Sequence, residues 1–227
     1  MSAAVNPAET AEIAGRVVAI RRAPGRREEL VALLAEQSAI YRGLSAGAAE
    51  RLRGFILASF EKAGLPPSAL PFVQEELRTG INPYTVAAAA KALRGTAEIS
   101  DATFALLVAA AERVAGKDDN VQYETMDPGD RAAPRTSALA EIVRTIAASG
   151  PRARPLWAAI DAMAAHGNVC AEAMTAIERA RQALSSPSAA HCCCTAEPPL
   201  LVLPAQSPAA QDISDLALED QSGATFK

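Results

Sequence analysis

Apolar residues recur every three or four positions along most of the chain between residues 24 and 184. This spacing places them on one face of an α-helix, whereas strict alternation with polar residues would indicate a strand. Glycine, proline and asparagine interrupt the pattern at short intervals. The pattern therefore predicts short helices joined by tight turns. The expected helical segments are residues 25–43, 45–64, 68–80, 82–95, 100–116, 136–150, 151–167 and 168–184.

Several of these segments carry capping residues at their ends. Ser68 is a candidate N-cap of the third segment, which we expect to end at Gly80. Asn82 precedes Pro83, and a capping residue followed by a first-turn proline is typical of a helix start. The third and fourth segments should therefore form a tight antiparallel pair. The first segment is expected to be one helix with a stripe of Leu30, Leu33, Leu34, Gln37, Ile40 and Tyr41.

The composition favours helices over sheets. Half of the 227 residues are hydrophobic, so the chain can bury a sizeable core, but aromatic residues make up only 4%. Alanine is abundant, and it favours closely approaching helices over sheets built from β-branched and aromatic residues. We therefore expect an all-α fold, either a short α-solenoid or a helical bundle of stacked helical hairpins.

Residues 70–95, LPFVQEELRTGINPYTVAAAAKALRG, contain a first helix that ends in leucine and a small loop. The second helix has the pattern V-x-x-A-A-x-A-L. This segment resembles a HEAT-type repeat, and residues 138–167 resemble a weaker second copy, within a resemblance that covers residues 45–184. The resemblance implies a curved array of hairpins that binds a protein or peptide along its concave face and has no catalytic activity. A helical bundle without repeats is the alternative.

The chain divides into four expected segments. Residues 1–23 form an N-terminal segment expected to be helical, and residues 24–184 form the helical domain. Residues 185–212 are rich in proline, serine and cysteine, which is typical of an extended linker. In residues 213–227 an alternating apolar pattern leads into a turn with glycine, so the otherwise irregular C-terminal tail is expected to form a β-hairpin.

One connection between expected helices is long. Residues 116–135 separate two helices where about two to eight residues are usual. The segment is acidic, but it lacks the alternating carboxylate ladder of a calcium-binding loop. A loop that contacts a partner and a solvated loop both remain open. Its acidic residues are Asp118, Asp119, Glu124, Asp127 and Asp130.

The candidate metal ligands are His191, Cys192, Cys193 and Cys194, in the segment HCCCTAEPP. In an extended chain alternate side chains share one side, so Cys192 and Cys194 would present two thiolates together. Two soft sulfur ligands suit Cu(I), whereas tetrahedral zinc normally draws on spaced ligand pairs. The segment is therefore a candidate for binding Cu(I) or another soft metal, or for thiol exchange. A tail whose thiols have no function is the alternative.

Residues 213–227, ISDLALEDQSGATFK, resemble the opening β-hairpin of redoxin domains of the Sco/SenC copper-chaperone or peroxiredoxin kind. The resemblance implies a helical module and a Cys-rich linker placed before a redoxin domain that continues beyond Lys227. The catalytic cysteine pair and the metal-binding histidine of that family would also lie beyond residue 227. None of the family's functional residues can therefore be assigned within this sequence.

The sequence contains no nucleophile elbow, Walker loop, dinucleotide fingerprint, HExxH or CxxC motif. His166 falls at the end of an expected helix, where a cation is modestly favourable, so we expect a structural or solvent-facing role for it rather than ligation. Cys170 shares an apolar stripe with Met174 and Ile177 and is expected to be a buried small hydrophobe. We therefore expect no catalytic residues and no enzyme activity.

The net charge of −4 argues against nucleic acid as a partner, because affinity for it rests on neutralising phosphates. An arginine-rich N-terminal region is the local exception, and it is either a solvated helix face or a contact for an acidic partner. No stretch approaches the roughly 20 apolar residues that span a bilayer, and no signal peptide precedes the helices, so we expect a cytoplasmic protein without a membrane anchor. The arginines are Arg16, Arg21, Arg22, Arg26 and Arg27.

Two main functional hypotheses follow. In the first, a helical-repeat module binds a protein or peptide partner, and residues 191–194 handle a soft metal or exchange thiols for a redoxin partner domain. In the second, the helical domain presents residues 191–194 as a substrate that a partner enzyme modifies. A plain protein–protein interaction scaffold is the third reading.

Overall fold

The computed structural model describes residues 15, 17–19, 21, 25–115, 117, 121, 135–165 and 169–185. The chain divides into residues 1–188 and 189–227, and every described residue lies in the first part. The expected linker beyond residue 185 and the expected β-hairpin at residues 213–227 lie outside the described residues. In the N-terminal segment, residues 15, 17–19 and 21 are described and are helical, as expected.

The described part is all-α, as the sequence predicts. Its only β-pairing is a single antiparallel bridge between Val121 and Thr136. None of its helices is long and apolar enough to cross a membrane. In chain order, with η for 3-10 helices, the elements are α2 (Arg27–Leu34), η1 (Ala39–Tyr41), α3 (Ala46–Ala63), η2 (Pro67–Ala69), α4 (Leu70–Thr79), α5 (Pro83–Ala92), η3 (Leu93–Gly95), α6 (Asp101–Val114), α7 (Ala138–Ala148), η4 (Gly150–Leu156), α8 (Trp157–Ala165) and α9 (Ala171–Ser185).

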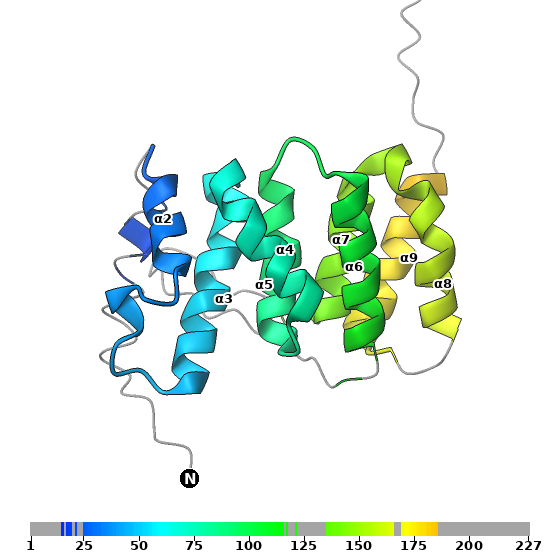
Figure 1. Ribbon diagram of the computed structural model, residues 1–227. Helices are drawn as coiled ribbons and strands as arrows, with labels where there is room; N and C mark the ends of the chain where they lie inside the picture. The colour runs from blue at the N-terminus through cyan, green and yellow to red at the C-terminus, as the bar shows by residue number, and fades with distance from the viewer. Residues whose placement is uncertain are drawn as a thin grey trace, which may run out of the picture. The chain divides into compact units, whose positions relative to one another are not determined.

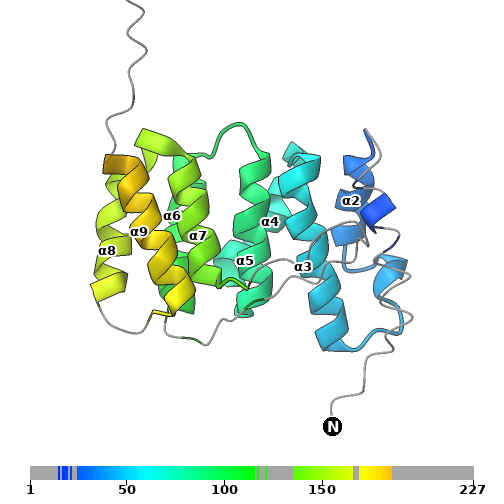
Figure 2. The ribbon, with the colours of Figure 1, turned by 180° about the vertical axis from the view of Figure 1, so that it is seen from behind.

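The helices stack side by side in two layers (Figure 1). In one layer α6 lies between α4 and α8, and in the other α3, α5, α7 and α9 follow one another in that order (Figure 2). The hairpins α4–α5, α6–α7 and α8–α9 each place one helix in each layer. At one end of the stack α2 packs against α3. This arrangement confirms the predicted stack of helical hairpins.

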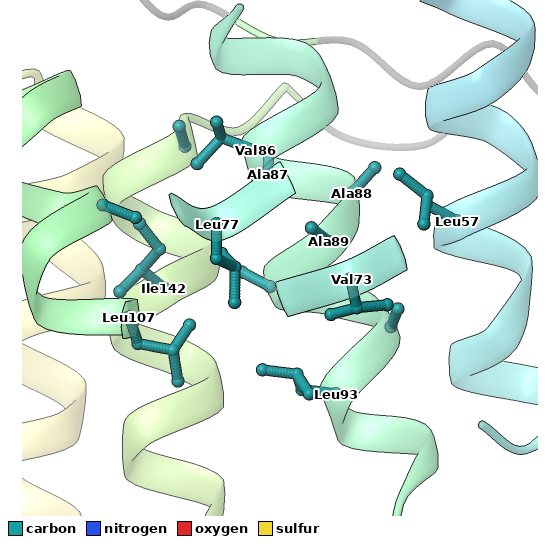
Figure 3. Packing of buried hydrophobic residues seen from close by; sticks show 14 of the residues in the cluster. Leu57, Val73, Leu77, Val86, Ala87, Ala88, Ala89, Leu93, Leu107 and Ile142 are labelled. Carbon is teal, nitrogen blue, oxygen red and sulfur yellow. The ribbon is translucent and has the colours of Figure 1, made fainter. Parts of the chain in front are cut away.

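Helix α5 lies at the centre of the core, in contact with α3, α4, α6 and α7. Its residues Val86 to Ala90 are completely buried. Leu57 of α3 faces Ala88, while Val73 and Leu77 of α4 lie against the same helix (Figure 3). The alanines let neighbouring helices approach closely, because a small side chain keeps the two backbones near each other.

Four of the predicted helix starts are confirmed by side-chain caps. The side chains of Ser45, Asn82, Ser100 and Ser137 accept hydrogen bonds from backbone N–H groups at the starts of α3, α5, α6 and α7. The prediction for Ser68 is wrong. It lies in η2 before α4, and its Oγ donates to Glu28 Oε2 at 2.6 Å instead of capping a helix.

Two predicted helices are shorter than their apolar patterns suggest. The segment 25–43 forms two short elements, α2 and η1, instead of one helix, because the backbone turns to an extended conformation at Ala35 (ψ 132°). Gln37, assigned to the buried stripe, is exposed. The segment 151–167 starts as the 3-10 helix η4, which contains Pro155, and becomes α-helical only at Trp157.

Gly95, the last residue of η3, permits a close approach to the last turns of α3. A Cβ atom at this position would lie 2.1 Å from the carbonyl oxygen of Phe60. The Gly95 carbonyl accepts a hydrogen bond of 2.9 Å from the amide of Leu65, just after α3. The contact holds η3 against the end of α3.

Candidate functional site

The predicted metal ligands His191, Cys192, Cys193 and Cys194 lie outside the described residues, and so does His166. Cys170 is described. It is a free, half-buried thiol that directly precedes α9 and packs against the core. Ile177 on the same stripe is fully buried, and Met174 is half-buried. The position of Cys170 on the apolar side is thus confirmed, but its burial is partial.

The described residues contain no group of three or more His, Cys, Asp or Glu side chains placed to hold a metal ion. Their most distinctive polar feature is a cluster of charges, centred on the buried Glu141 and the largely buried Arg94, that joins three helices of one layer. We call it the Arg94 cluster. It consists of Glu61 on α3, Lys91 on α5, Arg94 on η3, and Glu141 and Arg144 on α7.

Arg94 is the centre of this cluster. Its Nε donates to Glu61 Oε1 at 2.7 Å, and its second terminal nitrogen donates to Glu141 Oε2, also at 2.7 Å. Its first terminal nitrogen reaches the hydroxyl of Thr145 at 3.1 Å. The guanidinium group therefore links α3 to α7 across the end of α5. A planar fork of donors suits such simultaneous contacts with two carboxylates.

Glu141 is the most buried carboxylate of the cluster, with 5% of its side chain exposed. Burial alone would raise its pKa, but the charge of Arg94 and hydrogen bonds from Arg94 and Thr136 outweigh that effect, so its pKa lies below the usual value. Burial likewise opposes the charge of Arg94, whose pKa is nevertheless raised by Glu141 and Glu61. Both groups are therefore ionised at neutral pH.

Beside this cluster lies a depression of about 160 Å³ between η3, the start of α6, the end of α7 and η4. We call it the α6–α7 depression. Leu93, Ile99 and Phe104 give it a buried apolar lining, whereas Glu98, Ala148 and Arg152 are exposed. The remaining lining residues are Arg94, Thr96, Ala97, Thr145 and Ser149.

The polar groups that line the depression are already engaged within the protein. The hydroxyl of Thr145 donates to the carbonyl of Ala90 at 2.7 Å, and Ser149 Oγ donates to the carbonyl of Thr145 at 3.1 Å. Arg152 pairs with Glu98 and Asp101. Since its two arginines are paired with carboxylates, the depression suits an uncharged group. It is also smaller than the roughly 300–1,000 Å³ typical of small-molecule sites.

Sequence reasoning missed both features. Arg94 and Glu141 lie 47 positions apart, and only the packing of α5 beside α7 brings them together. The one available signal is Glu141 itself, since a charged residue between Ala140 and Ile142 on an apolar helix indicates a buried carboxylate with a partner. Nothing in the sequence indicates the depression, which is formed by four separate elements.

No family model matches the chain, and no match was found among curated proteins or solved structures.

Proposed function

We propose that the helical domain is a non-catalytic, HEAT-like binding module that recognises a protein or peptide partner, one of whose side chains enters the α6–α7 depression. The observation that carries the proposal is the combination of a buried apolar lining with an exposed polar margin where η3, α6, α7 and η4 meet. Recognition sites in protein interfaces commonly join an apolar anchor pocket to polar surroundings.

The size and charge of the depression define the kind of partner. A volume of about 160 Å³ accommodates one side chain rather than a cofactor. Arg94 is balanced by Glu61 and Glu141, and Arg152 by Glu98 and Asp101. An entering charge would therefore find no unpaired counter-charge among these groups. The preferred anchor is an uncharged apolar side chain, with polar neighbours that contact Glu98 or Arg152.

Selection of random peptides displayed on phage against the full chain tests this proposal. Ala148 is exposed and lines the depression, so Ala148→Trp should fill it without disturbing the core. Ala109→Trp is the matched control, because Ala109 is exposed on α6 and does not line the depression. Enriched peptides should share an apolar anchor and bind Ala148→Trp about tenfold or more weakly. Equal binding to wild type and to Ala148→Trp would refute the proposal.

We propose further that residues 191–194 bind Cu(I), or another soft metal, or exchange thiols for a redoxin partner domain. The support is chemical, since the sequence places one imidazole and three thiols in consecutive positions and soft ligands select soft metals. A cytoplasmic location fits this role, because thiols are kept reduced there.

Competition for Cu(I) with a chromogenic chelator tests the metal-binding role. The wild-type chain and the Cys170→Ser variant should remove the same amount of Cu(I) from the chelator, because Cys170 belongs to the folded helical part. A variant with serine at Cys192, Cys193 and Cys194 should withdraw much less. Metal binding by this segment is ruled out if the triple variant binds as much copper as Cys170→Ser.

A further inference from the structure

An antiparallel bridge joins Val121 to Thr136. The amide of Val121 donates to the carbonyl of Thr136 at 2.7 Å, and the amide of Thr136 donates back at 2.9 Å. Both residues are buried, with 5% and 3% of their surfaces exposed. Only these two backbone hydrogen bonds form the bridge itself, so its persistence depends on how Thr136 is held.

The side chain of Thr136 attaches the bridge to the Arg94 cluster. Its hydroxyl donates to Glu141 Oε1 at 2.8 Å and accepts from Arg144 at 2.6 Å. The other oxygen of the same carboxylate, Oε2, accepts from Arg94. Arg94 in turn holds Glu61 on α3. The two oxygens of the Glu141 carboxylate thus have different roles. Oε1 holds the residue that forms the bridge, and Oε2 holds the arginine that connects α3, η3 and α7.

We propose that Glu141 is a conformational latch that couples the Val121–Thr136 bridge to the contact that Arg94 of η3 makes with α3 and α7. If Arg94 withdraws, Glu141 remains buried without its main counter-charge and is driven toward water, away from the hydroxyl of Thr136. If Thr136 withdraws, Glu141 Oε1 loses a donor, and the carboxylate shifts relative to Arg94. Opening at either place therefore loosens the other.

Three backbone hydrogen bonds report the two ends of the latch. The amides of Val121 and Thr136 report the bridge, and the amide of Leu65, bonded to the Gly95 carbonyl, reports the contact of η3 with α3. Hydrogen exchange of the full chain measures how often each bond opens. The amide of Leu107, in the buried face of α6, serves as the internal reference for global unfolding.

Glu61→Gln weakens the hold on Arg94 from α3 and leaves the hydrogen bonds of Thr136 in place. The latch predicts that exchange at Val121 and Thr136 accelerates about threefold or more relative to Leu107. In the reverse test, Thr136→Val removes the hydroxyl but keeps the side-chain shape, and should accelerate Leu65 by a similar factor. Glu75→Gln, which alters the exposed pair with Arg78, is the control and should leave all three amides unchanged.

The double variant Glu61→Gln/Thr136→Val separates coupling from two independent effects. Sites that do not interact have additive effects, so independent action multiplies the two accelerations at each amide. The latch predicts that exchange in the double variant accelerates by less than this product, since the second change acts on a connection that the first has already broken. The proposal is overturned if Glu61→Gln leaves Val121 and Thr136 at wild-type rates, if all amides including Leu107 accelerate equally, or if the two accelerations multiply.

Discussion

At the scale of single residues, the main feature of the molecule is a charged pair kept in a mostly apolar interior. Arg94 and Glu141 are both largely buried, and removing them from water is costly. The surrounding donors offset that cost, because Thr136 and Arg144 contact the oxygen of Glu141 that Arg94 does not use. Such a pair depends on both members being present and charged.

Glu141→Gln should lower the free energy of unfolding at neutral pH by about 2–3 kcal/mol, because it leaves Arg94 short of one counter-charge. The pKa of Glu141 is lower in the folded state, so its charge stabilises the fold above the unfolded-state pKa and loses this effect as pH falls. Urea unfolding at about pH 7 and about pH 3 measures both effects. Wild type should lose more stability than the variant over this range, and parallel losses would contradict the assignment.

Gly95→Ala should destabilise the protein by about 1–3 kcal/mol, since the new methyl group would collide with the backbone of Phe60. Gly47→Ala is the control, because a Cβ there meets no atom within 4 Å and alanine favours the helix. Thermal unfolding measures the stability of both variants, and only Gly95→Ala should unfold at a lower temperature than the wild type. A stable Gly95→Ala variant would show that η3 and α3 do not approach as closely as described.

At the scale of elements, the sequence predicted helix starts best where a capping residue directly precedes an apolar stripe. Ser100 and Ser137 combine a hydroxyl cap with a following apolar face, and α6 and α7 begin where expected. The first predicted helix was too long because the apolar spacing continues through Ile40 and Tyr41, which pack from a separate 3-10 turn. Periodicity cannot separate one helix from two short elements that contact the same core.

Ser137→Ala should cost about 1 kcal/mol, because a buried cap that accepts from the amide of Ala140 at 3.0 Å is lost. Ser68→Ala tests the corrected assignment. Its hydroxyl bonds only an exposed glutamate side chain, so the change should stay within about 0.5 kcal/mol. Chemical denaturation distinguishes the two, and a larger loss for Ser68→Ala would restore Ser68 as a helix cap.

At the scale of the whole described domain, the stacking of hairpins follows from composition more than from any single motif. Abundant alanine and short connections predicted helices in close contact, and α5 is enclosed in this way. The α6–α7 depression was not predictable, because it depends on how η3, α6, α7 and η4 meet. The architecture is thus encoded locally, whereas the candidate site arises from tertiary packing.

Ala88→Leu should destabilise the stack by about 1–3 kcal/mol, since Ala88 is fully buried opposite Leu57. Ala109→Leu, on the exposed face of α6, adds the same atoms where there is room and should be nearly neutral. Thermal unfolding compares the two variants. Equal stability would mean that α5 is not enclosed by its neighbours.

The central claim is that a partner is recognised at the α6–α7 depression. Hydrogen exchange of the full chain, measured with and without a peptide selected from the library, tests this claim directly. Binding should slow exchange at residues 96–100 and 148–152, which border the depression, and this protection should be absent in Ala148→Trp. Protection confined to the exposed faces of α4 and α6, or to residues 191–194, would contradict the claim.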